Sequence, residues 1–205
     1  MAFGLSDPVA AAGIPPVTTK ILVAGGFGVG KTTLVGTISE VRPLRTEEPL
    51  TGMGIGIDDV TAVKHKTTTT VAMDFGRITF PGGVVLYLFG TPGQDRFWFM
   101  WDELAFGALG AVVLADTRRL ADCFASVDYF ERRGTPFIVA ANCFEGARRY
   151  DPAAIRDALD LDPDVPTLLC DARRRESVRE VLIASVMHSL AMHQVRLRPE
   201  GSPQG

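Results

Sequence analysis

The chain contains little cysteine, and its cysteines, Cys123, Cys143 and Cys170, lie far apart in the sequence. An odd number of widely spaced cysteines favours neither a disulfide framework nor a zinc cluster, and it indicates a reducing compartment. The chain also lacks an apolar run long enough to span a bilayer, and it lacks an N-terminal cationic segment followed by an apolar core. We therefore expect a cytoplasmic protein without a membrane span or a secretory signal.

An excess of charge of one sign is also missing. The net charge is −3 over 205 residues, which gives no reason to expect a nucleic-acid partner. Met1-Ala2 does not fit N-myristoylation, and the residues Ser202–Gly205 offer no cysteine for prenylation. Without an intrinsic membrane anchor, any recruitment to a membrane would have to come through a partner.

The composition is that of one globular domain, with 46% hydrophobic and 22% charged residues. Residues 1–17 are rich in Ala, Gly and Pro, and residues 195–205 have a similar polar and Pro-Gly-rich character. Both stretches are typical of mobile tails. We therefore expect a folded domain over residues 18–194.

Short apolar runs alternate with segments of helical length, which predicts a three-layer α/β fold with ligand-binding loops at the carboxyl ends of the strands. The sheet is expected to be mostly parallel and six-stranded, with one antiparallel edge strand that alternates in polarity and precedes a Pro-Gly-Gly turn. The near-continuous apolar runs are Lys20–Ala24, Val84–Phe89, Ala111–Ala115, Pro136–Ala141 and Pro166–Leu169, and the alternating strand is Val71–Phe80. Helices are expected near residues 31–40, 95–107, 120–133, 152–160 and 174–193. The last helix should bury the face that carries Val178, Val181, Leu182, Val186 and Leu190.

The first apolar strand leads directly into a glycine-rich turn that fits the pattern G-x-x-x-x-G-K-[ST]. A strand before this pattern and a helix after it are the context of a P-loop, in which backbone N–H groups curl around phosphates. Lys31 should reach the β- and γ-phosphates, and the hydroxyl of Thr32 should ligate Mg²⁺. The nucleotide contacts expected here are Gly25, Gly26, Phe27, Gly28, Val29, Gly30, Lys31, Thr32 and Thr33.

Further segments follow the P-loop in a fixed order: Thr67–Thr70, Phe89-Gly90-Thr91-Pro92-Gly93-Gln94, Asn142-Cys143-Phe144-Glu145 and Cys170-Asp171-Ala172-Arg173. Together they resemble the nucleotide-contacting motifs of the Ras-like small GTPases, over roughly residues 18–193. Within that superfamily the chain looks closest to the bacterial GTPases of actinobacterial conserved four-gene operons. The resemblance implies a P-loop G domain that binds GTP and GDP with Mg²⁺. It also implies two partners, a roadblock-type regulator and a sensor-kinase-like protein.

The resemblance assigns roles around the γ-phosphate. Thr70, with Thr69 as an alternative, would ligate Mg²⁺, the N–H of Gly93 would contact the γ-phosphate, and Gln94 would orient the attacking water. The family usually has an aspartate three residues before this glycine, where the chain has Gly90. The carboxylate that supports Mg²⁺ must then come from elsewhere, and the sequence does not rank Asp74, Asp58 and Asp59.

Two loops would hold the guanine base. Asn142 would brace its loop and approach the base. Glu145 stands where the family has the aspartate that accepts hydrogen bonds from guanine N1 and N2. Cys143 replaces the lysine that normally packs over the base. In the last loop, the N–H of Ala172 would meet guanine O6, and Arg173 could stack near the base. Asp171 could cap the loop instead of binding a ligand.

Several departures from the family bear on hydrolysis. The family generally has a small residue where the chain has Phe27. Its ring could crowd the γ-phosphate and slow hydrolysis, or it could fold back onto apolar neighbours. The segment Arg42–Lys66 is long for a switch and could pair at the sheet edge in one nucleotide state; Arg42 or Arg45 could act as an arginine finger in cis. The aromatic run Phe97–Trp101 favours a partner surface over pure core.

These motifs favour a regulatory GTPase that hydrolyses GTP slowly without a partner. Phe27 and Gly90 leave open a nucleotide-dependent scaffold without catalysis. The altered base-contacting loops leave open an adenine-nucleotide enzyme.

Overall fold

The computed structural model describes residues 17–42, 44–50, 69–93 and 99–197. The strands are β1 (Val17–Ala24), β2 (Leu44–Leu50), β3 (Thr69–Phe80), β4 (Val84–Gly90), β5 (Gly110–Ala115), β6 (Phe137–Asn142) and β7 (Thr167–Cys170). The helices are α1 (Lys31–Ile38), α2 (Trp101–Ala105), the 3₁₀ turn η2 (Leu120–Cys123), α3 (Phe124–Arg133), α4 (Pro152–Ala158) and α5 (Arg175–Leu197).

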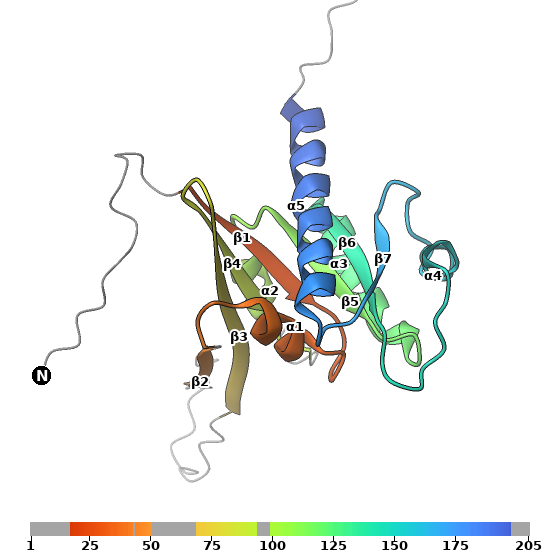
Figure 1. Cartoon of the computed structure of the whole chain (residues 1–205), viewed down its shortest axis with the longest axis horizontal. Helices are drawn as coiled ribbons and strands as arrows, with labels where there is room; N and C mark the ends of the chain where they lie inside the picture. Colours follow the sequence, from red (N-terminus) through yellow and green to blue (C-terminus); the bar gives the residue numbers. More distant parts are fainter. Residues whose placement is uncertain (1–16, 43, 51–68, 94–98, 198–205) are drawn as a thin grey trace, which may run out of the picture.

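These strands form one seven-stranded sheet in the order β2-β3-β4-β1-β5-β6-β7. β3 runs antiparallel to both of its neighbours, and the remaining strand pairs are parallel. Helices lie on both faces of the sheet and give the molecule three layers (Figure 1). The predicted fold, a mostly parallel sheet with one antiparallel strand, is therefore confirmed.

All six expected strands form, and β2 adds a seventh outside β3. The antiparallel strand therefore lies one place inside the edge of the sheet. The sequence of β2, Leu-Arg-Thr-Glu-Glu-Pro-Leu, shows no apolar pattern. Charged residues and proline are tolerated there because an edge strand has one side without a pairing partner. β2 belongs to the long segment Arg42–Lys66, of which residues 43 and 51–68 lie outside the described residues.

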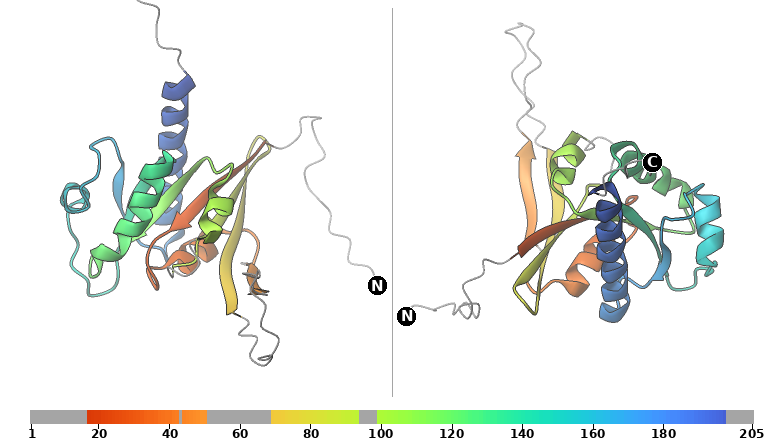
Figure 2. Two further views of the ribbon diagram at one scale, coloured as in Figure 1. Left: turned by 180° about the vertical axis from the view of Figure 1, so that it is seen from behind. Right: turned by 90° about the horizontal axis from the view of Figure 1, so that it is seen from above.

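Alternate residues of the central strands face opposite layers, as the pleat of a strand requires. In β1, Ile21 and Val23 belong to the core that α1 and α5 cover. Leu22 and Ala24 belong to the second core, to which α2, α3 and α4 contribute. The view from behind shows α2 and α3 on the face opposite α5 (Figure 2). Burial on both faces explains why these strands have near-continuous apolar sequences.

The long helix α5 differs from its predicted pattern in its second half. Val178, Val181 and Leu182 are buried as expected, but Leu190 is 44% exposed. Ser185 and Ser189 are fully buried in its place. These small side chains let α5 pass close to the start of β5, where the Cβ of Ser189 would lie 3.1 Å from a Cβ added to Gly110.

Element boundaries shift slightly from the expected ones. β1 begins at Val17 and α5 continues to Leu197, so both reach into the expected tails. The rest of those tails, residues 1–16 and 198–205, lies outside the described residues. The helix expected near 95–107 is present as the short α2, and residues 94–98 before it are not described. Within the described ranges, no helix combines the length and the apolarity needed to cross a bilayer.

Candidate functional site

The loops after β1, β4, β5, β6 and β7 meet at one edge of the sheet, as the carboxyl ends of parallel strands do. The first of them, residues 25–30, joins β1 to α1. Gly25 and Gly30 have φ values of 131° and 106°, which L side chains rarely adopt. A Cβ on Gly25 would also overlap the carbonyl of Leu114, and one on Gly30 would lie 2.6 Å from the amide nitrogen of Asn142. Both positions therefore require glycine.

Lys31 turns its ammonium group back into this loop. Its Nζ donates to the carbonyls of Gly25 at 2.7 Å and Gly26 at 2.8 Å. Burial lowers the pKa of Lys31 to about 8, while the nearby carboxylate of Asp74 acts in the opposite direction. A Cβ on Gly93 would lie 2.6 Å from the same Nζ, so the structure brings the predicted γ-phosphate glycine directly against the predicted phosphate-binding lysine.

Thr32, the predicted magnesium ligand, donates its hydroxyl to Asp74 Oδ2 at 2.6 Å. Asp74 lies on β3 in register with Gly90 on β4. A Cβ added to Gly90 would lie 2.9 Å from the Cβ of Asp74, so the aspartate fills the space that a side chain at position 90 would need. Hydroxyl and carboxylate oxygens suit Mg²⁺, and Asp74 is thus the candidate carboxylate that lies at the site. Asp58 and Asp59 lie outside the described residues.

Asn142 connects the phosphate loop to the last loop of the site. Its side-chain nitrogen donates to the carbonyl of Val29 at 2.9 Å, and its oxygen accepts the N–H of Ala172 at 3.1 Å. Asn142 is buried, so these bonds are not exposed to competition from water. Asn142 therefore links the phosphate loop to the loop that follows β7. The N–H of Ala172, expected to meet guanine O6, is already donated to Asn142.

Among the remaining base-loop residues, Glu145 and Arg173 lie on the surface, whereas Cys143 and Asp171 are partly buried. The side chain of Glu145 is 93% exposed, and its carboxylate lies 3.8 Å from Arg173. Asp171 accepts the backbone N–H of Arg173 at 3.0 Å and two further bonds from its guanidinium. Those hydrogen bonds lower the pKa of Asp171. Asp171 thus caps this loop, which was one of its two expected roles, and Arg173 links it to Glu145.

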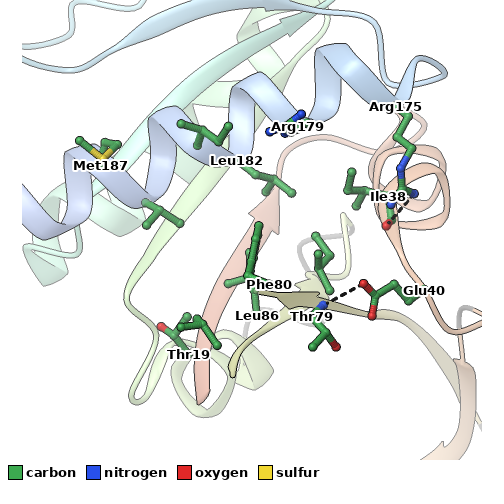
Figure 3. Close-up of a pocket in the computed structure, with 14 residues that line it drawn as sticks. Thr19, Ile38, Glu40, Thr79, Phe80, Leu86, Arg175, Arg179, Leu182 and Met187 are labelled. Carbon is green, nitrogen blue, oxygen red and sulfur yellow. Dashed lines mark hydrogen bonds between the residues drawn. The ribbon is translucent and has the colours of Figure 1, made fainter. Parts of the chain in front are cut away.

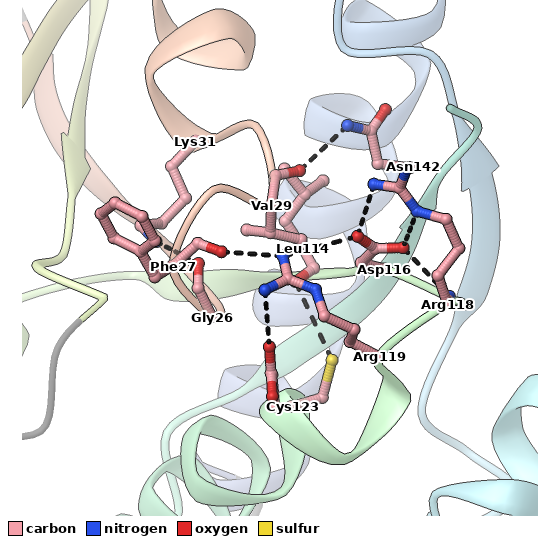
Figure 4. Close-up of polar contacts among 11 residues, drawn as sticks. Gly26, Phe27, Val29, Lys31, Leu114, Asp116, Arg118, Arg119, Cys123 and Asn142 are labelled. Atoms are coloured by element: carbon pink, nitrogen blue, oxygen red, sulfur yellow. Dashed lines mark hydrogen bonds and ion pairs between the residues drawn. The ribbon is translucent and has the colours of Figure 1, made fainter. Parts of the chain in front are cut away.

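The turn after β5 carries polar residues that belong to none of the predicted motifs. Asp116 is buried and accepts two hydrogen bonds from the guanidinium of Arg118, at 2.7 and 2.8 Å. These bonds are the main reason that the pKa of Asp116 is lowered. Arg118 also lies 3.9 Å above the ring of Phe144, in the predicted base loop. Arg119 donates to the carbonyl of Phe27 at 3.0 Å, on the phosphate loop itself (Figure 4).

A sequence signal for this cluster does exist. The stretch Asp116-Thr117-Arg118-Arg119 directly follows a buried parallel strand, where ligand loops are expected. It matches none of the family motifs, so the resemblance assigns it no role.

Phe27 lies at the crest of the phosphate loop, a term used here for residues 26–28, and 68% of the residue is exposed. The ring therefore does not fold back onto apolar neighbours, which was one of its two expected placements.

The aromatic run after β4 has residues in two different environments. Trp101 is buried against Tyr129 and Phe130, whereas Phe99 is 60% exposed. Its described part is thus partly core and partly surface.

Other predicted residues cannot be placed. Gln94, Phe97 and Trp98 lie outside the described residues. Thr69 and Thr70 are the first residues of β3, and only their backbone is described. The same holds for Arg45 in β2.

An apolar groove of about 550 Å³ lies away from this edge, between α1, α5 and the strands β1, β3 and β4 (Figure 3). Ile78, Leu86, Leu182 and Met187 are among its lining residues. None of the residues of the phosphate loop lines it, so it does not belong to the site described above.

A glycine-rich strand–helix turn with Lys31 and Thr32 at its end, set in this sheet, defines a nucleotide-binding P-loop protein with a G-domain fold. The chain belongs to the family described as conserved hypothetical ATP-binding proteins, whose model matches residues 23–192.

Solved structures agree with the fold. The G domain of the FeoB iron transporter from T. maritima has a TM-score of 0.59 at 19% identity, with 84% of this chain and 99% of that chain covered. The FeoB G domain from Methanococcus jannaschii has a TM-score of 0.56 at 13% identity, with 85% and 99% covered. At these identities the likeness concerns the fold alone.

A curated relative is an uncharacterized protein from Methanocaldococcus jannaschii, 33% identical over 100 residues. The match covers 49% of this chain and 52% of that protein, so the chain spans about half the length of the curated relative it matches.

Proposed function

We propose that the chain is a guanine-nucleotide switch that binds GTP and GDP with Mg²⁺ and hydrolyses GTP slowly in bacterial signalling. The observation that carries this proposal is the position of Asn142, which ties the phosphate loop to the last loop. Glu145 follows it in the same loop and supplies a carboxylate that can accept hydrogen bonds from both N1 and N2 of guanine. Adenine offers no such pair of donors.

The phosphate end supports nucleotide hydrolysis. Backbone N–H groups of residues 25–30 and the ammonium of Lys31 would bind the phosphates, and Thr32 and Asp74 would hold Mg²⁺. A bound Mg²⁺ neutralises charge that develops on the phosphate oxygens during transfer. Gln94 and Thr70 keep their proposed roles in orienting water and completing the metal site. Phe27, exposed at the crest, would hinder an arginine approaching from a partner and keep the reaction slow.

The partners proposed from the resemblance are a roadblock-type regulator and a sensor-kinase-like protein. Recruitment of the cytoplasmic protein to a membrane would occur through them. No nucleic-acid partner is proposed.

An adenine nucleotide is the second candidate, because the family carries the description of ATP-binding proteins. The exposed Glu145 forms only a long ion pair with Arg173, and such surface pairs contribute little energy. The base loop would then acquire its final geometry only when the nucleotide binds.

The first experiment identifies the nucleotide that purified protein releases on denaturation and measures GDP affinity for Glu145→Ala. We expect GDP or GTP in the released fraction and at least a tenfold loss of GDP affinity in the variant, because hydrogen bonds to a charged group contribute about 1.5–3 kcal/mol. Glu176→Ala is the matched control, since the side chain of Glu176 is 88% exposed and also pairs with an arginine. A released adenine nucleotide, with GDP affinity unchanged in Glu145→Ala, would overturn the guanine assignment.

A further inference from the structure

The N–H groups of the phosphate loop must face the phosphates, so its carbonyl groups are left to bind water or side chains of neighbouring loops. In this structure Lys31 donates hydrogen bonds to the carbonyls of Gly25 and Gly26. The same ammonium is expected to move onto the β- and γ-phosphates when a nucleotide binds. Those two hydrogen bonds are then given up, and the loop needs other connections to keep its shape.

Two side chains from neighbouring strand ends hold the loop without competing for the phosphates. Asn142 fixes the carbonyl of Val29 near the start of α1. Arg119 fixes the carbonyl of Phe27 at the crest, with 3.0 Å between Nη2 and the oxygen. The crest has little stiffness of its own, since glycine precedes and follows Phe27 and Gly28 has a φ of 73°. Arg119 therefore restrains the part of the loop that its sequence leaves most free.

The surroundings of Arg119 aim its guanidinium at the crest. Its backbone N–H donates to the carbonyl of Asp116 at 2.9 Å, which closes a tight turn after β5. Its two terminal nitrogens each lie 3.6 Å from a carboxylate, one of Asp116 and one of Asp122. Asp116 is itself held by Arg118 (Figure 4). The guanidinium is thus oriented before any ligand arrives, which lowers the entropic cost of its bond to Phe27.

We propose that Arg119 is a positioning residue that retains the bound nucleotide. By fixing the carbonyl of Phe27 it keeps the crest N–H groups directed at the phosphates, and so it slows nucleotide release. The inference rests on the proposed function only in that the phosphate loop holds a nucleotide, and it does not depend on which base is bound.

The test compares the rates at which a fluorescent nucleoside diphosphate dissociates from the full wild-type chain and from Arg119→Ala. The base of this nucleotide is the one found bound to the purified wild-type protein. Loss of a charge-assisted hydrogen bond should speed release about tenfold to a hundredfold. Arg119→Lys, which keeps one positively charged donor, should fall between the two. Arg132→Ala is the matched control: Arg132 is a surface arginine that bonds a backbone carbonyl, on α3, and release should stay within about twofold.

Two further readouts separate positioning from a general structural role. The melting temperature of the nucleotide-free protein in chelator should fall by no more than about 2–4 °C in Arg119→Ala, because its contacts at the half-exposed surface contribute little to the fold. The rise in melting temperature on addition of a nucleoside diphosphate should be clearly smaller in Arg119→Ala than in wild type. Unchanged release in Arg119→Ala overturns the proposal, as does faster release accompanied by an equal loss of stability without nucleotide. Failure of the wild-type chain to bind GDP, with binding of ADP, refutes the guanine assignment alone.

Discussion

At the residue scale, the ammonium group of Lys31 is largely shielded from water. Only 9% of the residue is exposed, and burial lowers its pKa from 10.5 to about 8. Between these two values the unfolded chain binds more protons at Lys31 than the folded protein does. The contribution of Lys31 to the free energy of unfolding of the nucleotide-free protein therefore rises with pH across that window.

Nucleotide binding should respond to pH in the opposite direction. Phosphates stabilise the ammonium form, so binding above pH 8 must return a proton to Lys31, and affinity should fall by up to tenfold for each further pH unit. Titration calorimetry at pH 9, in buffers of different ionisation enthalpy, should show close to one proton taken up; at pH 7 it should show little uptake. Equal uptake at both pH values would contradict this role for Lys31.

At the scale of elements, the contact between α5 and β5 sets how closely the helix approaches the sheet. Gly110 opens β5, and a Cβ there would lie 2.9 Å from the carbonyl oxygen of Pro136 and also overlap the hydroxyl of Ser189. The buried Ser185 and Ser189 give α5 the small surface that this approach needs.

Gly110→Ala should therefore lower the free energy of unfolding by about 1–3 kcal/mol, since the added methyl group meets backbone that cannot move freely. Urea denaturation measures the change. Gly36→Ala makes the same substitution at an exposed position within α1, where it should instead stabilise the protein by about 0.5–1 kcal/mol. A Gly110→Ala midpoint equal to that of the wild type would show that the helix has room to shift.

The sequence predicts the buried central strands better than it predicts the strand at the edge of the sheet. β1, β5 and β6 are found because burial on both faces imposes continuous apolar runs. β2 is missed because Glu47, Glu48 and Pro49 carry no such pattern, and its place follows from pairing with β3. A strand whose sequence is set by its exposed edge leaves little for periodicity to detect.

In the site, likewise, some residues can be predicted from a local pattern and others cannot. Gly25, Gly30 and Lys31 are found from a contiguous motif, because one turn must supply the whole phosphate cradle. Asp74 could not be ranked from the sequence, since its contact with Thr32 depends on the register of β3 against β4. The role of Arg119 could not be predicted from the sequence, because its partner, the carbonyl of Phe27, is a backbone atom on a distant loop.

At the scale of the whole molecule, the site gathers residues from strands that are far apart in the chain. Lys31 follows β1, Asp74 belongs to β3, and Asn142 ends β6. A ligand that contacts all of these at once favours the folded chain over the unfolded one and adds to its stability by mass action.

A nucleoside diphosphate with Mg²⁺ should raise the melting temperature by roughly 5–10 °C at a hundred times its dissociation constant, from about 2.7 kcal/mol of linkage in a protein of this size. Chelation of Mg²⁺ should remove most of the shift, and Asp74→Asn should need about tenfold more Mg²⁺ to reach it. Scanning fluorimetry measures both, with Mg²⁺ alone as the control. A shift that is insensitive to chelator would argue against a metal held by Thr32 and Asp74.

The close approach of Asp74 and Gly90 makes the residue at one of these positions depend on the residue at the other. A Cβ at position 90 would stand 2.9 Å from the Cβ of Asp74, so a side chain on β4 and the carboxylate on β3 exclude each other. On this backbone, position 90 can carry a side chain only if position 74 gives up its own. A search for relatives that demands an aspartate on the strand of Gly90 would discard this chain, whereas one that accepts either arrangement of the pair would retain it.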